Sequence, residues 1–266
     1  MIYLDDEITW PSSLRELLDD RLGALSAFER ERQRVDKLAE TDWSYRYNPP
    51  SNPHEGARER TVAEIDDCLR EEAVAGYHCT RLCADEIEII RSTGLRPLSP
   101  DLARERVRRR VEAGDFSLAV GARILAETRA DDSNLPERRS GMTWFVFTAN
   151  PLREEAGVGR FFAYWGGEAL YVCHEEDPEV GPALRAAGTA CIVEAAVAVR
   201  AIETYCSVGE RVLRCFLHRR DIETGHDPDV EGFVREPVPG SSICRIIQRK
   251  DADFERLTRC STWARR

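Results

Sequence analysis

Residues 75–95 constrain the fold of this chain more than any other stretch, because a short strand passes there directly into a helix. The strand carries His78 and Thr80, which lie two positions apart and therefore share one face. The helix that follows is acidic and rich in isoleucine, and it ends at Gly94. The pattern predicts that an imidazole and a hydroxyl point together into the space beside the strand.

The second half of the chain is expected to be rich in strands. Aromatic and β-branched residues dominate its apolar runs, and glycine or proline residues separate them. The candidate strands are residues 142–148, two pieces within 160–172 joined by a glycine pair, 190–199, 211–217, and a strand, proline turn and strand over 230–247. For residues 190–199 a helix stays open as the alternative, although the first half of this run favours a strand.

The remainder of the chain is predicted to be mainly helical. The predicted helices are a leucine-rich helix capped by Ser12 or Ser13, one over about 62–72, an arginine-rich one after Ser99 and one over about 117–128. Between the first two helices, residues 43–54 contain three prolines and indicate a loop.

The composition argues against several classes of protein. A net charge of −10 disfavours strong indiscriminate binding to nucleic acid or anionic lipid. No apolar run is long enough to span a bilayer and the start does not resemble a signal peptide, so we expect a cytoplasmic protein. The nine cysteines are scattered without a disulfide framework, which indicates small buried apolar residues. Cys79 and Cys83 beside His78 lack a second ligand pair, so no metal site is expected.

Two motifs resemble the ADP-ribosyltransferase fold in its histidine class. The family opens with His-x-Thr, an acidic isoleucine-rich helix and then Gly-Leu, which Gly94-Leu95 matches. Its catalytic glutamate begins a strand of the form Glu-x-x-Val, as residues 231–234 do. A proline turn then leads to a closing strand like residues 242–247. Glu231 is the preferred catalytic candidate, and Glu236 competes with it.

This resemblance implies a fold and a domain organisation. The class includes poly(ADP-ribose) polymerase relatives, RNA 2′-phosphotransferases and bacterial toxins that modify nucleic acids. It implies an α+β fold with a split antiparallel β-sheet core, an N-terminal helical appendage and a helical insertion. The expected domains are 1–72, the appendage and its loop; 73–250, the catalytic domain with the insertion over 96–140; and 251–266, a C-terminal tail.

The resemblance also implies a site that takes NAD as a cosubstrate and holds no metal. His78 would donate a hydrogen bond to the nicotinamide ribose, and Thr80 would support that ribose or the adjoining phosphate. Glu231 would stabilise the positive charge that develops on the sugar. An aromatic on a central strand would stack on nicotinamide. Tyr164 is the preferred aromatic because glycines lie close to it, and the alternatives are Tyr171, Trp165 and Phe147.

The implied activity is mono-ADP-ribosyl transfer from NAD to a macromolecular acceptor. Within an arginine cluster, Arg104, Arg108 and Arg109 are candidates for contacts with nucleic acid, although Glu105 and Glu112 also permit a balanced, solvated face. A protein acceptor is equally compatible with the net acidity. The alternatives are an NAD-dependent RNA 2′-phosphotransferase and a non-catalytic nucleotide-binding domain. From the family alone, the resemblance suggests a toxin or antiphage defence effector controlled by an antitoxin or another regulator.

Overall fold

The computed structural model describes residues 1–131, 140–205, 207–225 and 230–263, which fold as two compact units. The first unit contains Met1–Val74, Ala198–Arg200 and Thr204–Val230. The second contains Ala75–Val197, Ala201–Glu203 and Glu231–Arg266. The expected division into 1–72, 73–250 and 251–266 stays a prediction.

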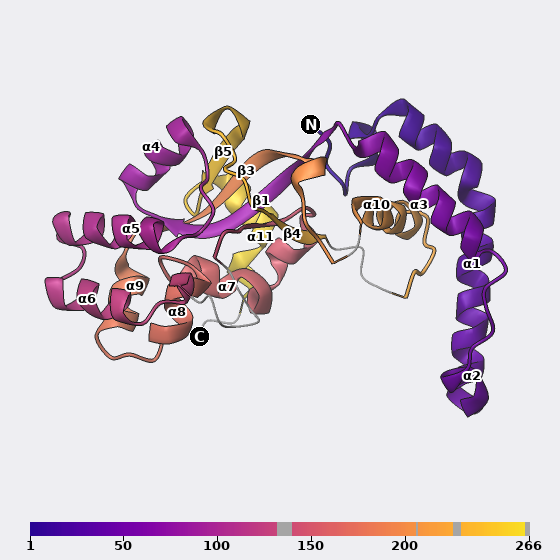
Figure 1. Ribbon diagram of the computed structural model, residues 1–266, viewed down its shortest axis with the longest axis horizontal. Helices are drawn as coiled ribbons and strands as arrows, with labels where there is room; N and C mark the ends of the chain where they lie inside the picture. The colour runs from indigo at the N-terminus through magenta and orange to yellow at the C-terminus, as the bar shows by residue number, and fades with distance from the viewer. Residues whose placement is uncertain (132–139, 206, 226–229, 264–266) are drawn as a thin grey trace. The chain divides into compact units, whose positions relative to one another are not determined.

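The first unit is built from helices α1 (Ser12–Thr41), α2 (Trp43–Tyr47), α3 (Glu55–Leu69) and α10 (Val208–His218). Helix α1 forms because its leucines recur on one face, where Leu14, Leu18 and Leu25 are buried. Helix α3 packs against both α1 and α10 (Figure 1). Among the described residues, no helix combines the length and the hydropathy that crossing a bilayer requires.

The fold is of the α+β class. Its five-stranded β-sheet lies almost entirely in the second unit. Its strands are β1 (Ala73–Leu82), β2 (Thr143–Val146), β3 (Thr189–Ala198), β4 (Glu231–Val234) and β5 (Ile243–Gln248). Their order is β4-β2-β1-β3-β5, and the pairs β1–β2, β2–β4 and β3–β5 are antiparallel. The central strands β1 and β3 are buried over most of their length. The strands predicted over residues 142–148 and in the final strand, turn and strand are present. For residues 190–199, where strand and helix were both open, the structure shows a strand.

Helices surround this sheet. They are α4 (Ala84–Thr93), α5 (Pro100–Glu112), α6 (Leu118–Ala126), α7 (Glu155–Ala163), α8 (Glu168–His174), α9 (Val180–Ala186) and α11 (Ala252–Thr258). Helix α6 packs on α5 and α9, and α8 packs on α9 (Figure 1). A core cluster centred on the fully buried Trp165 includes Phe116, Ile124 and Leu184. The arginine-rich helix and the one after it were expected as an insertion.

Two predicted strands are helices. Residues 160–172 fall in α7 and α8, and the glycine pair between these helices forms a turn in which Gly166 has φ 90° and Gly167 φ 70°. Residues 211–217 lie in α10, where Val212 and Phe216 are buried four positions apart. Both runs are rich in aromatic or branched residues, which fit a strand as well as a buried helix. The prediction of strands was wrong here because these apolar side chains are buried on the faces of helices in the folded protein.

Candidate functional site

A cavity of about 100 Å³ lies between one face of β1 and the helices α4 and α5. Both His78 and Thr80 line it, as the alternation of side chains along the strand predicts. The remaining lining residues are Leu82 of β1, Glu86, Ile89 and Ile90 of α4, Gly94, Leu95 and Arg96 after α4, and Leu102, Arg106 and Arg109 of α5. Apolar walls and a few convergent charged groups are typical of a binding site for a small molecule.

His78 presents a neutral ring to this cavity. Its Nδ1 lies 2.8 Å from the backbone carbonyl oxygen of Trp144 in β2, and because a carbonyl only accepts, Nδ1 carries the proton. Burial lowers the pKa of His78 below 6.5, the bond to Trp144 opposes this, and the charge of Arg106 lowers the pKa further. In the neutral ring Nε2 is then an acceptor. The expected hydrogen bond to ribose therefore runs the other way, from the sugar hydroxyl to His78.

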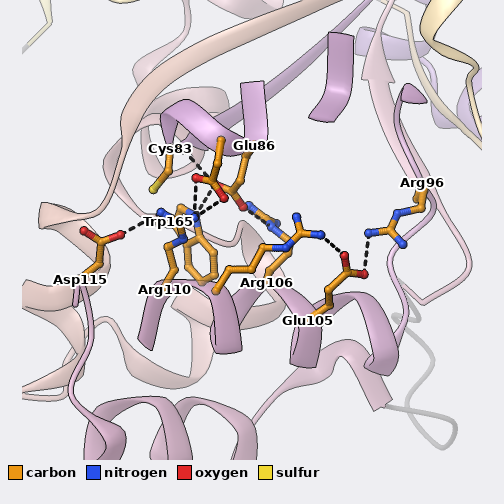
Figure 2. A network of polar contacts seen from close by, with 10 residues as sticks. Cys83, Glu86, Arg96, Glu105, Arg106, Arg110, Asp115 and Trp165 are labelled. Atoms are coloured by element: carbon orange, nitrogen blue, oxygen red, sulfur yellow. Dashed lines mark hydrogen bonds and ion pairs between the residues drawn. The ribbon is translucent and has the colours of Figure 1, made fainter. Parts of the chain in front are cut away.

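Glu86 is a buried carboxylate that joins three segments (Figure 2). One oxygen, Oε2, accepts hydrogen bonds from the backbone N–H of Cys83 at 2.9 Å and from Nε1 of Trp165 at 2.8 Å. The other, Oε1, accepts from Nε of Arg106 at 2.7 Å. Burial alone would raise the pKa of Glu86, but Arg106 and these hydrogen bonds lower it, so the group stays ionised. Glu86 thus fixes the start of α4 and one arginine of the cavity.

Three arginines line the cavity: Arg96 follows α4, and Arg106 and Arg109 lie on α5. Figure 2 shows Arg96 and Arg106 with their carboxylate partners. Nη2 of Arg96 donates to Oε2 of Glu105 at 2.8 Å, and Arg109 donates to Oε1 of the same carboxylate. The guanidinium of Arg106 lies over the ring of Trp165, 4.7 Å from its centre, and its Nη2 is buried without a hydrogen-bond partner. Three positive charges face two carboxylates here. The excess favours an anionic ligand.

A second ion-pair cluster holds α5 against the start of α4. Arg110 is 4% exposed and donates to Asp85 at the start of α4 and to Asp115 after α5. This buried guanidinium links α4 to α5 through Asp85, and loss of Arg110 would leave both carboxylates without this partner. The wall of the cavity is therefore built on rigid elements rather than on a free loop.

Glu231 does not line the cavity. It is exposed, begins β4 and stands opposite Val146, which in turn stands opposite Tyr77. Residues directly opposite each other share a face, so Glu231 lies on the face of Tyr77 and not on that of its neighbour His78. His78 and Phe145 lie together on the opposite face of the sheet, where the centres of their rings are 5.9 Å apart. The competing candidate, Glu236, is also exposed and follows β4.

The aromatic candidates lie away from the cavity. Tyr164 ends α7 instead of lying on a central strand, and its hydroxyl accepts a hydrogen bond from Nη1 of Arg185 at 2.7 Å. Tyr171 is buried in α8 with its ring 5.7 Å from that of Tyr164. Trp165 is a core residue bonded to Glu86, and Phe147 packs near Gly76. Among the described residues, no tyrosine, tryptophan or phenylalanine lines the cavity.

The predicted acceptor-binding arginines divide into two groups. Arg104 and Arg108 are exposed and paired on their own helix with Asp101 and Glu112, respectively. They form a solvated face, which was the alternative interpretation. Arg109 instead lines the cavity.

Several cavity residues escaped the sequence analysis. Glu86 caps its helix with Cys83, and a cysteine at that position does not indicate a capping box as serine or threonine would. Arg96 follows the Gly-Leu turn, and Arg106 lies within a cluster that looked uniformly solvated. Nothing in the spacing of these residues distinguishes the half-buried Arg106 from its exposed neighbours. Only the packing of α5 against α4 distinguishes them.

The described cysteines form no disulfide, and Cys206 lies outside the described residues. Cys83, Cys191 and Cys215 are buried, whereas Cys68, Cys173 and Cys244 are exposed, so the prediction of buried apolar cysteines holds for some of them. Burial raises the pKa of Cys83 to about 11, which keeps it a thiol at neutral pH. In the described part of the chain, no cluster of three or more His, Cys, Asp or Glu side chains is arranged to hold a metal ion.

Comparison with known proteins returned no family model, no curated protein and no solved structure that matches this chain.

Proposed function

We propose that the chain is an NAD-dependent enzyme with an ADP-ribosyltransferase-like core, and that the cavity beside β1 binds the ADP-ribose part of NAD. The observation that carries the proposal is that His78 and Thr80 line one cavity together with three arginines. A sugar hydroxyl can donate to Nε2 of His78, and guanidinium groups suit phosphate oxygens. At about 100 Å³ the cavity is smaller than the roughly 300–1,000 Å³ of typical ligand pockets, so it would take only one sugar or phosphate group of NAD. The rest of NAD would extend outside.

The reaction breaks the bond between nicotinamide and its ribose. NAD and an acceptor bearing a hydroxyl or amine yield ADP-ribosyl acceptor, nicotinamide and a proton. The sugar becomes oxocarbenium-like, so a carboxylate that approaches it lowers the barrier. Glu231 is our candidate for this role. It begins the edge strand β4, two positions from β1 in the sheet and roughly 10 Å away, but on the face opposite to His78. The proposal therefore requires the nicotinamide riboside to pass around the edge of the sheet at β4.

A second candidate is an NAD-dependent RNA 2′-phosphotransferase. Enzymes of that kind resemble the same scaffold, carry several arginines around a phosphate and lack the catalytic carboxylate. The placement of Glu231 on the face opposite to His78, together with Arg96, Arg106 and Arg109 at the cavity, favours this alternative. A nucleotide-binding domain without activity would use the same cavity and release no nicotinamide.

The acceptor is a separate question. Arg104 and Arg108 are exposed on α5 and could meet a phosphate backbone, but each is already paired and the net charge is −10. Both nucleic acid and protein therefore stay as proposed acceptors. Incubation with labelled NAD and separate pools of RNA, DNA and protein distinguishes them, because only the pool with the acceptor gains label. Label on protein alone would exclude the nucleic-acid version.

The experiment that tests the activity is release of free nicotinamide from NAD by the wild type, by Glu231→Gln and by Glu236→Gln. We expect Glu231→Gln to bind NAD but to lose about two to three orders of magnitude in rate. Glu236→Gln changes the matched carboxylate five residues from the first in the same segment and should keep its rate. Wild-type turnover in Glu231→Gln would remove Glu231 from the mechanism and favour the phosphotransferase.

A further inference from the structure

We infer that Glu105 lowers the affinity of the cavity for a phosphate-bearing ligand, because it binds one N–H group each of Arg96 and Arg109 and cancels positive charge that would attract a phosphate. The inference rests on the proposed function for the identity of the ligand as a nucleotide. The inference goes beyond the proposed function because it names the arginines that bind the phosphate and the residue that sets their affinity for it.

The geometry of Glu105 carries the first step. Its two carboxylate oxygens accept hydrogen bonds from two different arginines, Arg96 at 2.8 Å on one oxygen and Arg109 on the other. Both arginines line the cavity, and they come from different segments. A phosphate group also offers several oxygens to guanidinium donors. Glu105 therefore binds one N–H donor of each arginine and leaves their other donors for a phosphate, so it competes mainly through its charge.

The electrostatics of the cluster carry the second step. The hydrogen bond from Arg96 lowers the pKa of Glu105, burial opposes this slightly, and the charges of Arg96 and Arg109 lower the pKa further. Glu105 is thus fully ionised at neutral pH and cancels one of the three positive charges. Glu86 cancels another through Arg106. Loss of the Glu105 charge would leave two uncompensated arginines and a stronger attraction for a phosphate.

The orphaned nitrogen of Arg106 supports the same ligand. Its Nη2 is buried and has no hydrogen-bond partner, although Nε of the same side chain is bound to Glu86. A buried donor without a partner costs free energy, and a phosphate oxygen in the cavity would satisfy it. Glu105 is not placed to do so, because it is already shared between the other two arginines.

The ion pair between Glu105 and Arg109 differs from the neighbouring pair on α5. Arg108 pairs with Glu112 four residues later in a bond between two exposed side chains, which is an ordinary helix pair. Glu105 makes the equivalent pair with Arg109 and adds a contact to Arg96 that spans nine positions of sequence. Glu112 is therefore a matched control for Glu105.

The test is calorimetric titration of inorganic pyrophosphate and of ADP into the wild type, Glu105→Gln and Glu112→Gln. Glutamine keeps the shape and the hydrogen-bonding oxygen but removes the charge. We expect Glu105→Gln to bind both probes about tenfold more tightly, and Glu112→Gln to match the wild type. Arg109→Ala should weaken both probes in the wild-type background. Thermal unfolding of each variant shows whether it is folded.

Three outcomes would overturn the inference. They are equal or weaker binding in Glu105→Gln than in the wild type, the same gain in Glu112→Gln, and no binding of either probe by any folded variant at millimolar concentration. Failure of the proposed function gives a different result. In that case pyrophosphate binding would still tighten in Glu105→Gln, but NAD would release no nicotinamide.

Discussion

At the scale of single residues, the hydrogen bond from Nδ1 of His78 to the Trp144 carbonyl determines what the cavity can recognise. It fixes one tautomer and turns Nε2 into an acceptor, while the arginines supply the donors. A ribose phosphate offers the complement, with hydroxyl donors on the sugar and acceptors on the phosphate. Protonation of His78 would remove the acceptor and add a positive charge beside Arg106.

The lowered pKa of His78 predicts how the proposed cleavage of NAD depends on pH. Because the folded-state pKa lies below 6.5, the ring is neutral at pH 7, and kcat/KM should stay level from pH 8 to about 6.5. Below the lowered pKa it should fall tenfold per pH unit. Between that pKa and 6.5 the unfolded chain binds more protons, so folding stability should also rise with pH. An acid limb centred above 6.5 in the pH–rate profile would contradict the assignment.

At the scale of elements, the end of α4 shapes the cavity. Gly94 has φ 90°, and a Cβ there would collide with the backbone carbonyl of Val238. Leu95 and Val238 exchange two backbone hydrogen bonds, of 2.8 and 2.9 Å. The turn that follows β4 therefore holds the Gly94-Leu95-Arg96 wall in place, and glycine is required by both the positive φ and the close approach.

Gly94→Ala should therefore destabilise the protein by about 3 kcal/mol and weaken ADP binding, because the wall that carries Arg96 must move. Gly114→Ala is the control. Gly114 also has a positive φ, 81°, but nothing lies within 4 Å of its Cβ position, so its cost should be about 1 kcal/mol with ADP binding unchanged. Denaturant unfolding and calorimetry measure both effects. Equal losses of stability in the two variants would show that the contact with Val238 is unimportant.

The sequence predicts elements well where periodicity is unambiguous. The strand with His78 and Thr80 and the helix after it follow from a period of two and a glycine stop, and both are present. Residues 160–172 failed because clustered aromatics fit either structure, and the helices α7 and α8 bury them. The cavity could be predicted on its β1 side only. Its arginine side depends on long-range packing of α5, which no local pattern encodes.

At the scale of the whole molecule, charge is distributed unevenly. The chain carries a net charge of −10, yet one cavity gathers three arginines against two carboxylates. A protein of that charge repels polyanions in general and binds an anion only where its own cations converge. The proposed binding of NAD therefore depends on this cavity as a specific site for the anionic ADP-ribose part rather than on a general affinity for nucleotides.

The measurement that tests this claim most directly is calorimetric titration of NAD into the wild type, His78→Ala, Arg96→Ala and Arg91→Ala. Arg91 is exposed on α4 and paired with Glu88, so its removal controls for lost charge near the site. We predict that NAD binds the wild type and Arg91→Ala alike and binds the other two variants at least tenfold more weakly. No heat of binding to the wild type at millimolar NAD, or equal affinity in all four proteins, would contradict the account.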